Sequence, residues 1–399
     1  MYLLKSLFYY NKKILGGKIM GKERKEQGIH QRGSTYTIVV EGPRNNDGSR
    51  NQITKGGFRT KKEARVARIK LLNEINEGKY IVESEETFAS FVPYWFKHYE
   101  KRVKASTAST RKYTVDKHLV NDNPFSNKPI SKITTEDIDA LYNLKLEQGL
   151  SASTVKRIHQ LLNIALTQAV KWKRIKFNPA IDADPPPVNK EEMQIWSFKE
   201  IRAFLDKCNN SRYKILFLIA IYTGMRKGEI LGLKWSDIDL KKKKIHVQRT
   251  LQLIAEEGYI FTTPKTKKSI RQIPIPEFLI EQLLIFQKEQ ENWKNRLGEE
   301  YQDQNLVICT EKGTIQDPRN ILRKMKKICE EANVTPIRFH DIRHTHASIL
   351  ISEGVDLVKV SARLGHANAK ITMEIYAHLI PNQDDDVADI FHNAMNQSL

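Results

Sequence analysis

The residues best suited to chemistry lie in the second half of the chain, where short motifs combine arginine, lysine and histidine ahead of a tyrosine. These motifs are TGMRKGEI at 223–230, TPKTKKSIRQIPI at 263–275, HDIRH at 340–344, LGHA at 364–367 and IYAH at 375–378. An arginine side chain stays protonated, and its planar fork can hold two oxygens of an anion. A histidine can donate a hydrogen bond or carry a proton, and a tyrosine hydroxyl becomes a nucleophile when its proton leaves. Each motif alone is a weak signal, so their order and spacing decide the interpretation.

Together, the order and spacing of these motifs resemble the tyrosine recombinase (phage integrase) family over nearly all of residues 194–380. Members of that family cut a DNA strand by turning a phosphodiester into a 3′-phosphotyrosine. The transition state of this reaction gathers negative charge, which preorganised cations stabilise. The resemblance therefore implies that Arg226 and Arg343 hold the phosphate and that Tyr376 is the nucleophile.

The same resemblance implies roles for two histidines and a lysine. His340 would donate to a phosphate oxygen or move the proton of the nucleophile, and His366 would bind the scissile phosphate. A lysine on a β-turn protonates the leaving 5′-oxygen in this family, and Lys265 matches its position best. Lys267 and Lys268 stay open as alternatives, because GYIFTT and SIRQIPI are expected as two strands around KTKK and a small error in their register would exchange the lysines.

Simpler interpretations stay open in the same region. Arg226 could merely pair with Glu229, which follows it by three residues on a predicted helix. His344 and His346 suggest an H-x-H metal site, but residues two apart on a helix diverge, and no cysteine or carboxylate cluster completes the ligands. We therefore expect both histidines to be structural and expect no metal. The helix that bears them is expected to begin at Asp341.

Residues 28–80 are expected to form a small sheet followed by a helix. The run YTIVV at 36–40 and the segment QITKGGF at 52–58 are typical of strands, and the segment between them is rich in turn residues. Thr60 and Glu63 form a capping box that should start the helix. This layout resembles the arm-type-site-binding domain of integrases from phages and conjugative transposons, with an ordinary solvated basic helix as the alternative. Its DNA-binding candidates are Lys61, Lys62, Arg65 and Arg68.

Residues 87–184 are expected to be wholly helical, with four or five helices, in a layout that resembles the core-binding domain of the same family. Thr134 is the expected cap of one helix, and STVKRIHQLLNIALTQAVKWK places apolar residues at helical spacing. The basic segment KRVKASTASTRKYTVDKH mixes cations with hydroxyls, a composition typical of phosphate contacts, although a solvated loop stays open. Candidates for DNA binding in this segment are Lys104, Arg111 and Lys112.

Three prolines at 185–187 cannot lie within a helix and indicate a linker. Beyond them, Ser197 and Glu200 form a second capping box. We expect a multidomain, mainly α protein with small β elements. Its expected parts are an unfolded leader (1–20), an arm-type DNA-binding domain with a three-stranded sheet and a helix (21–82), a helical SAM-like core-binding domain (83–184), a Pro-rich linker (185–193) and a mixed α+β catalytic domain with a C-terminal tail helix (194–399).

The charge balance favours a polyanionic partner, nucleic acid above all, because 66 Lys and Arg oppose 47 Asp and Glu for a formal net charge of +19. The surplus is uneven: residues 1–80 hold 18 Lys and Arg against 7 Asp and Glu, whereas residues 81–399 hold 48 against 40. No run reaches the roughly 18 apolar residues that a membrane helix needs. Three scattered cysteines argue against a disulfide framework. We therefore expect a cytoplasmic protein with a concentrated basic N-terminal module and no membrane partner.

The resemblance implies a site-specific DNA recombinase that integrates a mobile element such as a phage or conjugative transposon, and that excises it with a helper such as an excisionase or a host DNA-bending protein. It implies double-stranded DNA partners at core and arm-type sites, four protomers on DNA, and no cofactor. Two alternatives stay open: a resolvase-like or type IB topoisomerase-like enzyme, and a non-catalytic DNA-binding regulator on a recombinase scaffold. The apolar stripe of the tail is expected to form a helix that caps its own domain or docks on a neighbouring protomer.

Overall fold

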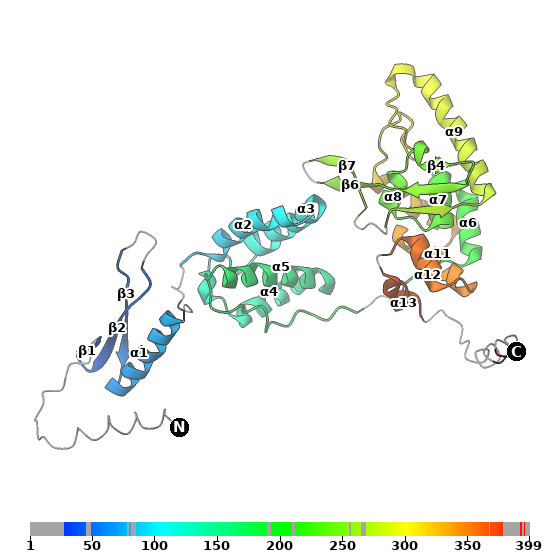
Figure 1. Cartoon of the computed structure of the whole chain (residues 1–399). Coiled ribbons are helices and arrows are strands. Elements are labelled where there is room, and N and C mark those ends of the chain that lie inside the picture. Colours follow the sequence, from blue (N-terminus) through cyan, green and yellow to red (C-terminus); the bar gives the residue numbers. More distant parts are fainter. Residues whose placement is uncertain are drawn as a thin grey trace, which may run out of the picture. The chain divides into compact units, whose positions relative to one another are not determined.

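The computed structural model describes residues 28–44, 49–77, 80, 85–189, 193–209, 212–254, 257–264, 269–366, 368–377, 392 and 395. The expected leader, the segment KTKK that holds Lys265, Lys267 and Lys268, and the tail apart from His392 and Met395 lie outside these residues. By its internal contacts the chain divides into two compact units (Figure 1). One comprises the residues up to 98 together with 114–186, and the other comprises 99–113 together with the residues from 187 onward.

The small sheet and helix expected near the N-terminus are confirmed. Strands β1 (Ile29–Arg32), β2 (Thr35–Glu41) and β3 (Gln52–Phe58) form an antiparallel sheet, and helix α1 (Lys61–Asn76) follows them. The helix packs Ala64 and Leu71 into one cluster with Ile38 of the sheet. The hydroxyl of Thr60 accepts the amide hydrogen of Glu63 at 3.2 Å, and the Glu63 carboxylate accepts the amide hydrogen of the residue before Thr60 at 3.0 Å. These bonds satisfy amides that a helix start leaves unpaired.

The helical segment is confirmed as well. Its helices are α2 (Phe88–Tyr99), α3 (Ala105–Thr114), α4 (Thr135–Glu147) and α5 (Ala152–Lys171), with a π-helical stretch at Val115–Asn121 and 3₁₀ turns at Glu100–Arg102 and Ile130–Lys132. The basic segment that could have been a loop forms α3. Thr134 caps α4, because its hydroxyl accepts the amide hydrogen of Asp137 at 3.3 Å and its own amide donates to the Asp137 carboxylate at 2.8 Å. On α5, Val155, Ile158 and Leu162 are fully buried, as the helical spacing predicts.

The remaining residues from 194 onward form a mixed α+β region. Its helices are α6 (Phe198–Cys208), α7 (Lys214–Thr223), α8 (Lys227–Leu231), α9 (Glu277–Leu297), α10 (Pro318–Ala332), α11 (Phe339–Ser352), α12 (Leu357–Leu364) and α13 (Ala369–Tyr376). Strands β4 (Ile238–Asp239), β5 (Lys244–Val247) and β8 (Arg271–Pro274) form one antiparallel sheet. Strands β6 (Thr250–Ile254) and β7 (Gly258–Thr262) form a separate hairpin (Figure 1). The Ser197 hydroxyl caps α6, as expected, by accepting the Glu200 amide hydrogen at 3.3 Å.

The strands on either side of KTKK exist but do not pair with each other. Strand β7 pairs with β6, whereas β8 pairs with β5, where Ile273 lies opposite Ile245. Both isoleucines are fully buried, whereas no residue of β7 is. Burial of Ile273 in the domain core explains why β8 pairs with β5. The two strands expected on either side of KTKK are therefore present, but they belong to different sheets.

Two apolar clusters organise this region. The larger one joins α6, α7, α9 and α10 with the β4-β5-β8 sheet, and the smaller one consists of Ala347, Ile351, Val360, Leu364 and Tyr376. The smaller cluster holds α11, α12 and α13 together and so fixes the end of α13 where Tyr376 lies. The three cysteines are buried and free. Among the described residues, no helix is long and apolar enough to cross a membrane.

Candidate functional site

Helix α11 starts two residues before the expected Asp341. Its first residue is Phe339, and the carboxylate of Asp341 accepts the amide hydrogen of Arg338 at 2.9 Å, which stabilises the helix start from inside the first turn. The reason for the difference is that Asp341 acts as the third helical residue and not as the cap. His340 is consequently exposed in the first turn, while Arg343 points inward and is 2% exposed.

The Arg343 guanidinium is held by the ends of two helices. Its Nη1 donates to the carbonyl of Gly224 at 2.9 Å, and its Nη2 donates to the carbonyl of Leu364 at 2.7 Å. These carbonyls lie at the C-terminal ends of α7 and α12, where the helix dipole favours a cation. Burial, and then repulsion from Arg226, lowers the pKa of Arg343 to about 9, which leaves it protonated at neutral pH. A permanent positive charge is thus fixed in a place with little water.

Two glycines make this arrangement possible. Gly224 (φ +63°) and Gly365 (φ +68°) end α7 and α12 in the left-handed conformation, which other residues adopt at a cost. A Cβ on Gly224 would lie 2.7 Å from the ring of His346, and one on Gly365 would lie 3.0 Å from the Arg271 side chain. The glycine in each of the motifs TGMR and LGHA therefore allows a helix end to turn beside the buried arginine.

A buried carboxylate orients a second arginine. Glu229 is 4% exposed and accepts hydrogen bonds from Arg226 Nη1 at 2.9 Å and from Arg271 Nη2 at 2.9 Å. Burial opposes ionisation of Glu229, but the hydrogen bonds and charges of Arg271 and Arg226 together outweigh it, so the pKa of Glu229 lies below its ordinary value. The simpler alternative, in which Arg226 pairs with Glu229, does occur. This ion pair leaves Arg226 able to bind an anion as well, because the Arg226 side chain stays 39% exposed and has five N–H groups to donate.

Tyr376 is fully buried, and its hydroxyl lies 2.6 Å from Nδ1 of His344. His344 was expected to be structural, so this contact corrects that expectation. The ring of His340 lies one turn earlier on α11, with its centroid 4.9 Å from that of His344 and the planes nearly perpendicular. The four-residue spacing within HDIRH places both rings on one face of the helix. That spacing was the signal that could have identified His344.

The protonation states of these groups follow from burial and from the arginines. Burial raises the pKa of Tyr376 to about 12, although the charge of Arg343 acts in the opposite direction. Burial also lowers the pKa of His344. Partial burial of the His340 ring lowers its pKa, and the charges of His344, Arg343 and Arg226 lower it further, to about 4. At neutral pH the tyrosine is therefore protonated and both histidines are neutral.

His366 lies in the short link between α12 and α13. Its Nδ1 hydrogen-bonds the hydroxyl of Thr372 at 2.7 Å, which orients the ring. Burial, followed by the charges of Arg343 and Arg226, lowers the pKa of His366 to about 4. The arginines that act on His366 also act on His340, so these two histidines face the same positive region.

His346 has a different environment. Its Nδ1 lies 2.8 Å from the carbonyl of Ile221, and its Nε2 accepts a hydrogen bond from Arg363 Nε at 3.0 Å. A carbonyl only accepts and an arginine only donates, so His346 is neutral with its hydrogen on Nδ1. Both nitrogens are occupied in joining α11 to α7 and α12, which is a structural arrangement. Within the described residues, no group of three or more His, Cys, Asp or Glu side chains could hold a metal ion.

Five of the six predicted catalytic residues come together in this region: Arg226, His340, Arg343, His366 and Tyr376. The sixth, Lys265, lies outside the described residues. The sequence analysis did not single out Arg271. It named Glu229 only as an ion-pair partner of Arg226, and it named His344 only as a structural residue. The arrangement presents one buried and one accessible guanidinium beside a protonated tyrosine, which suits the binding of a phosphate next to a nucleophile.

The DNA-binding candidates lie on α1 and on or just before α3. The exposed ones are Lys62, Arg65, Lys104 and Lys112. Lys61 is half-buried, and the Arg68 side chain lies against Gly28 at the start of the sheet. The Arg111 guanidinium lies 5.4 Å from the centroid of the Tyr99 ring, within range of a cation–π contact. Stacking of this kind restrains Arg111 near the exposed cations of α3.

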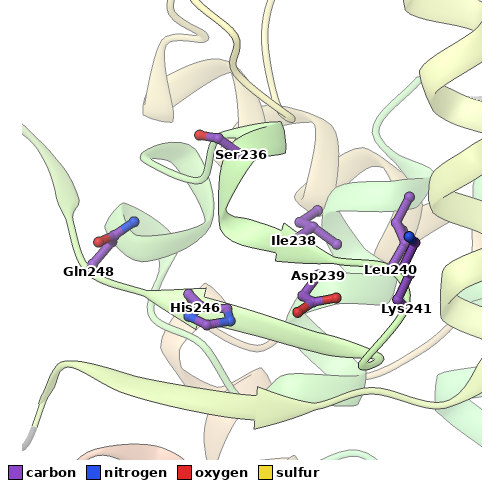
Figure 2. Close-up of a pocket in the computed structure, with 7 residues that line it drawn as sticks. All are labelled: Ser236, Ile238, Asp239, Leu240, Lys241, His246 and Gln248. Carbon is purple, nitrogen blue, oxygen red and sulfur yellow. The ribbon is translucent and has the colours of Figure 1, made fainter.

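An open hollow of about 480 Å³ lies on the β4-β5-β8 sheet (Figure 2). Its lining residues are Ser236, Ile238, Asp239, Leu240, Lys241, His246 and Gln248. Figure 2 shows His246 on β5 and Asp239 on the neighbouring strand β4. None of the predicted catalytic residues that the structure describes lines this hollow, so His246 serves as a reference histidine outside that set.

Comparison with known proteins identifies the family. The family model described as "Phage integrase family" matches residues 194–383, the "Phage integrase, N-terminal SAM-like domain" matches 87–146, and the "Arm DNA-binding domain" matches 28–75. A protein named "Tyrosine recombinase XerC-like" from Caldanaerobacter subterraneus subsp. tengcongensis is 34% identical over 84% of this chain and 90% of its own length. The "ICEBs1 integrase" of Bacillus subtilis is 31% identical over 83% of this chain and 89% of its own length. The chain belongs to the phage integrase family of tyrosine recombinases, which are DNA strand-exchange enzymes.

Solved structures of similar proteins show the same fold. The Tn1549 transposon integrase in complex with transposon right end DNA aligns with a TM-score of 0.65 at 20% identity, over 77% of this chain and 100% of that one. A lambda integrase from a tetramer bound to a Holliday junction aligns with a TM-score of 0.52 at 17% identity, over 91% of this chain and 99% of that one. The expected fold class, a small N-terminal sheet with a helix, a helical region and a mixed catalytic region, is confirmed.

The Glu229 ion pairs predict a pH-dependent stability contribution. Because the pKa of Glu229 is lowered in the folded chain, its charge stabilises the fold above its unfolded pKa of about 4.3. That contribution is lost as the pH falls through the lower folded value. Glu229→Gln should therefore destabilise the fold by about 3–5 kcal/mol near neutral pH, since it leaves the charge of Arg271 buried without its carboxylate.

The measurement is the free energy of unfolding of the unaltered protein and of Glu229→Gln between pH 7 and pH 3. The exposed Glu353→Gln is the matched control. The difference caused by Glu229→Gln should begin to shrink below about pH 4, where the unfolded chain binds a proton at Glu229, and should vanish once the pH falls below the lower folded pKa. A difference that is absent at pH 7, or that is the same at every pH, would contradict a stabilising ion pair.

Proposed function

We propose that this protein is a site-specific recombinase that integrates a mobile genetic element, and excises it with a helper, by cutting and rejoining DNA through a 3′-phosphotyrosine at Tyr376. The observation that supports this most strongly is the Tyr376 hydroxyl beside His344, in a region where Arg343 and Arg226 act on the surrounding histidines. The names of the relatives support the biological role, since one is an integrase of ICEBs1. A fold neighbour is a transposon integrase in complex with transposon DNA.

The scissile phosphate binds between the two arginines. Arg226 is accessible and approaches one non-bridging oxygen, while Arg343 uses N–H groups that the two helix carbonyls leave available. His340 and His366 are neutral and each can donate one hydrogen bond to the phosphate. The cations are fixed before DNA arrives, so they stabilise the charge that develops in the transition state without reorganising.

Strand cleavage and rejoining use the same groups in opposite directions. Tyr376 Oη forms a bond to phosphorus as the bond from phosphorus to the 5′-oxygen breaks, and Lys265 supplies the proton that the leaving oxygen needs. The 5′-hydroxyl of the partner strand then attacks the phosphotyrosine and releases Tyr376. The covalent intermediate conserves the energy of the phosphodiester, so the exchange requires no cofactor as an energy source.

The other parts of the chain bind DNA and the neighbouring protomers. The N-terminal module, proposed as residues 21–82, binds arm-type sites, and the helical domain, proposed as residues 83–184, clamps core DNA with the catalytic domain at 194–399. The concentration of positive charge in residues 1–80 supports binding to a polyanion. Four protomers act on two duplexes, and a lambda integrase tetramer on a Holliday junction is a fold neighbour that suits this arrangement. An excisionase or a host DNA-bending protein sets the direction, and the protein works in the cytoplasm.

Replacing the nucleophile tests the function directly. With a suicide DNA substrate, from which the cleaved strand diffuses away, the unaltered protein should accumulate a covalent protein–DNA adduct. Tyr376→Phe should form none, because it lacks the hydroxyl, while it binds core DNA as tightly. Tyr222→Phe is the matched control, since Tyr222 packs on the ring of Phe278 and should form adduct normally. Adduct with Tyr376→Phe would refute the assignment, and no adduct from any of these proteins would favour a DNA-binding regulator.

The lysine in the KTKK segment gives a separate prediction. Lys265→Ala should slow cleavage by about 100-fold or more without weakening DNA binding, because a positioned acid contributes about that much. A substrate with sulfur in place of the 5′-bridging oxygen should restore the rate, since a thiolate leaves without a proton. Single-turnover cleavage of both substrates is the measurement. If Lys268→Ala alone shows this behaviour, the acid is Lys268 and the assignment of Lys265 is wrong.

A further inference from the structure

His344 is the histidine that touches the nucleophile. Its Nδ1 lies 2.6 Å from the Tyr376 hydroxyl, a short distance for a hydrogen bond between a ring nitrogen and a phenol. Both side chains are anchored: Tyr376 is fully buried in the small apolar cluster, and His344 lies on α11 one residue after the fixed Arg343. His340, by contrast, contacts the His344 ring edge-on and is exposed. The geometry separates a histidine that faces the tyrosine from one that faces solvent and the arginines.

We propose that His344 accepts the proton of Tyr376 as the tyrosine attacks the phosphate, and returns it when the strand is rejoined. This proposal rests on the proposed function and adds a proton acceptor to it. The step balances as follows: the proton moves from Tyr376 Oη to His344 Nδ1, the bond between Oη and phosphorus forms, and the bond between phosphorus and the 5′-oxygen breaks. A separate acid, proposed above as Lys265, protonates the departing 5′-oxygen. On rejoining, the proton on His344 goes back to the released phenolate.

The electrostatics of the region explain why the proton stays on the tyrosine before DNA binds. Burial raises the pKa of Tyr376 to about 12 and lowers the pKa of His344, so transfer in the free protein is strongly unfavourable. As Oη bonds to phosphorus it loses its basicity, and the transfer then becomes favourable. The proton therefore moves with bond formation, and a reactive tyrosinate does not form without substrate.

The charged groups around His344 come mainly from its own helix. Asp341 favours the protonated ring, whereas Arg343 and Arg338 disfavour it. A protonated His344 on the reaction path is thus stabilised by Asp341 and by the negative charge of the bound phosphate, which offsets the arginines. The ring of His340 packs against His344 and keeps its plane directed at Tyr376.

The test compares His344→Asn with His344→Ala in single-turnover cleavage of a suicide substrate at saturating core DNA. Asparagine can place a hydrogen-bonding group near the position of Nδ1 but cannot accept a proton. If His344 is the proton acceptor, both variants should cleave about 100-fold or more slowly than the unaltered protein, with unchanged DNA affinity. His246→Asn, on strand β5 (Figure 2), should cleave at the normal rate because His246 is not among the predicted catalytic residues.

Two substitutions of the reacting groups identify which proton is affected. A fluorinated tyrosine of lower pKa at position 376 should recover much of the rate lost in His344→Asn, because less help is needed to remove its proton. A 5′-bridging sulfur in the DNA should not recover it, because that change helps only the leaving group. Normal cleavage by His344→Asn would overturn the proposal, since hydrogen bonding alone would then suffice. Rescue by the bridging sulfur would also overturn it.

These outcomes are distinct from failure of the proposed function. If the unaltered protein forms no adduct, both the proposed function and the proposed role of His344 are refuted. If the unaltered protein forms adduct and His344→Asn does so equally fast, only the role of His344 falls, and Tyr376 remains the nucleophile.

Discussion

The buried guanidinium of Arg343 is the constraint on which the arrangement of the site depends. It joins the carbonyl ends of α7 and α12, and each of those helices ends at a glycine whose backbone few other residues could adopt. Since α12 leads into α13 through His366, fixing the end of α12 also limits where Tyr376 can lie. Burial lowers the pKa of both His340 and His366, and the charge of Arg343 lowers it further. One side chain thus connects the fold of the C-terminal helices to the protonation state of the site.

A second constraint is that Tyr376, the proposed nucleophile, is buried and protonated. The small apolar cluster covers Tyr376, and its burial raises the pKa that the positive charge of Arg343 alone would lower. A phenol in this state is a poor nucleophile until a phosphate and a proton acceptor are both in place. Glu229 bonds to both Arg226 and Arg271, and it leaves the Arg226 side chain accessible for a phosphate. Binding and activation are therefore coupled through preorganised charges, which limits chemistry in the absence of DNA.

The sequence predicted what depends on local spacing. Thr134, Ser197 and the apolar face of α5 were correctly predicted from capping and periodicity, and the motif order led to the cluster of Arg226, His340, Arg343, His366 and Tyr376. It did not predict what depends on tertiary packing. Strands β7 and β8 adjoin in sequence, but β8 buries Ile273 against Ile245 in another sheet. Likewise, the four-residue spacing within HDIRH places His344 on the same helix face as His340, but only the docking of α13 on α11 shows that the Tyr376 hydroxyl lies beside it.

In the proposed mechanism, Arg226 and Arg343 stabilise the negative charge that develops on the scissile phosphate. The most direct measurement compares cleavage of a normal suicide substrate with one whose scissile phosphate is a methylphosphonate, which lacks one negative charge. Arg226→Ala should slow cleavage of the normal substrate by about 100-fold or more and slow the methylphosphonate far less, because there is less charge to stabilise. The exposed Arg319→Ala should change neither. An equal loss on both substrates with Arg226→Ala would contradict the account.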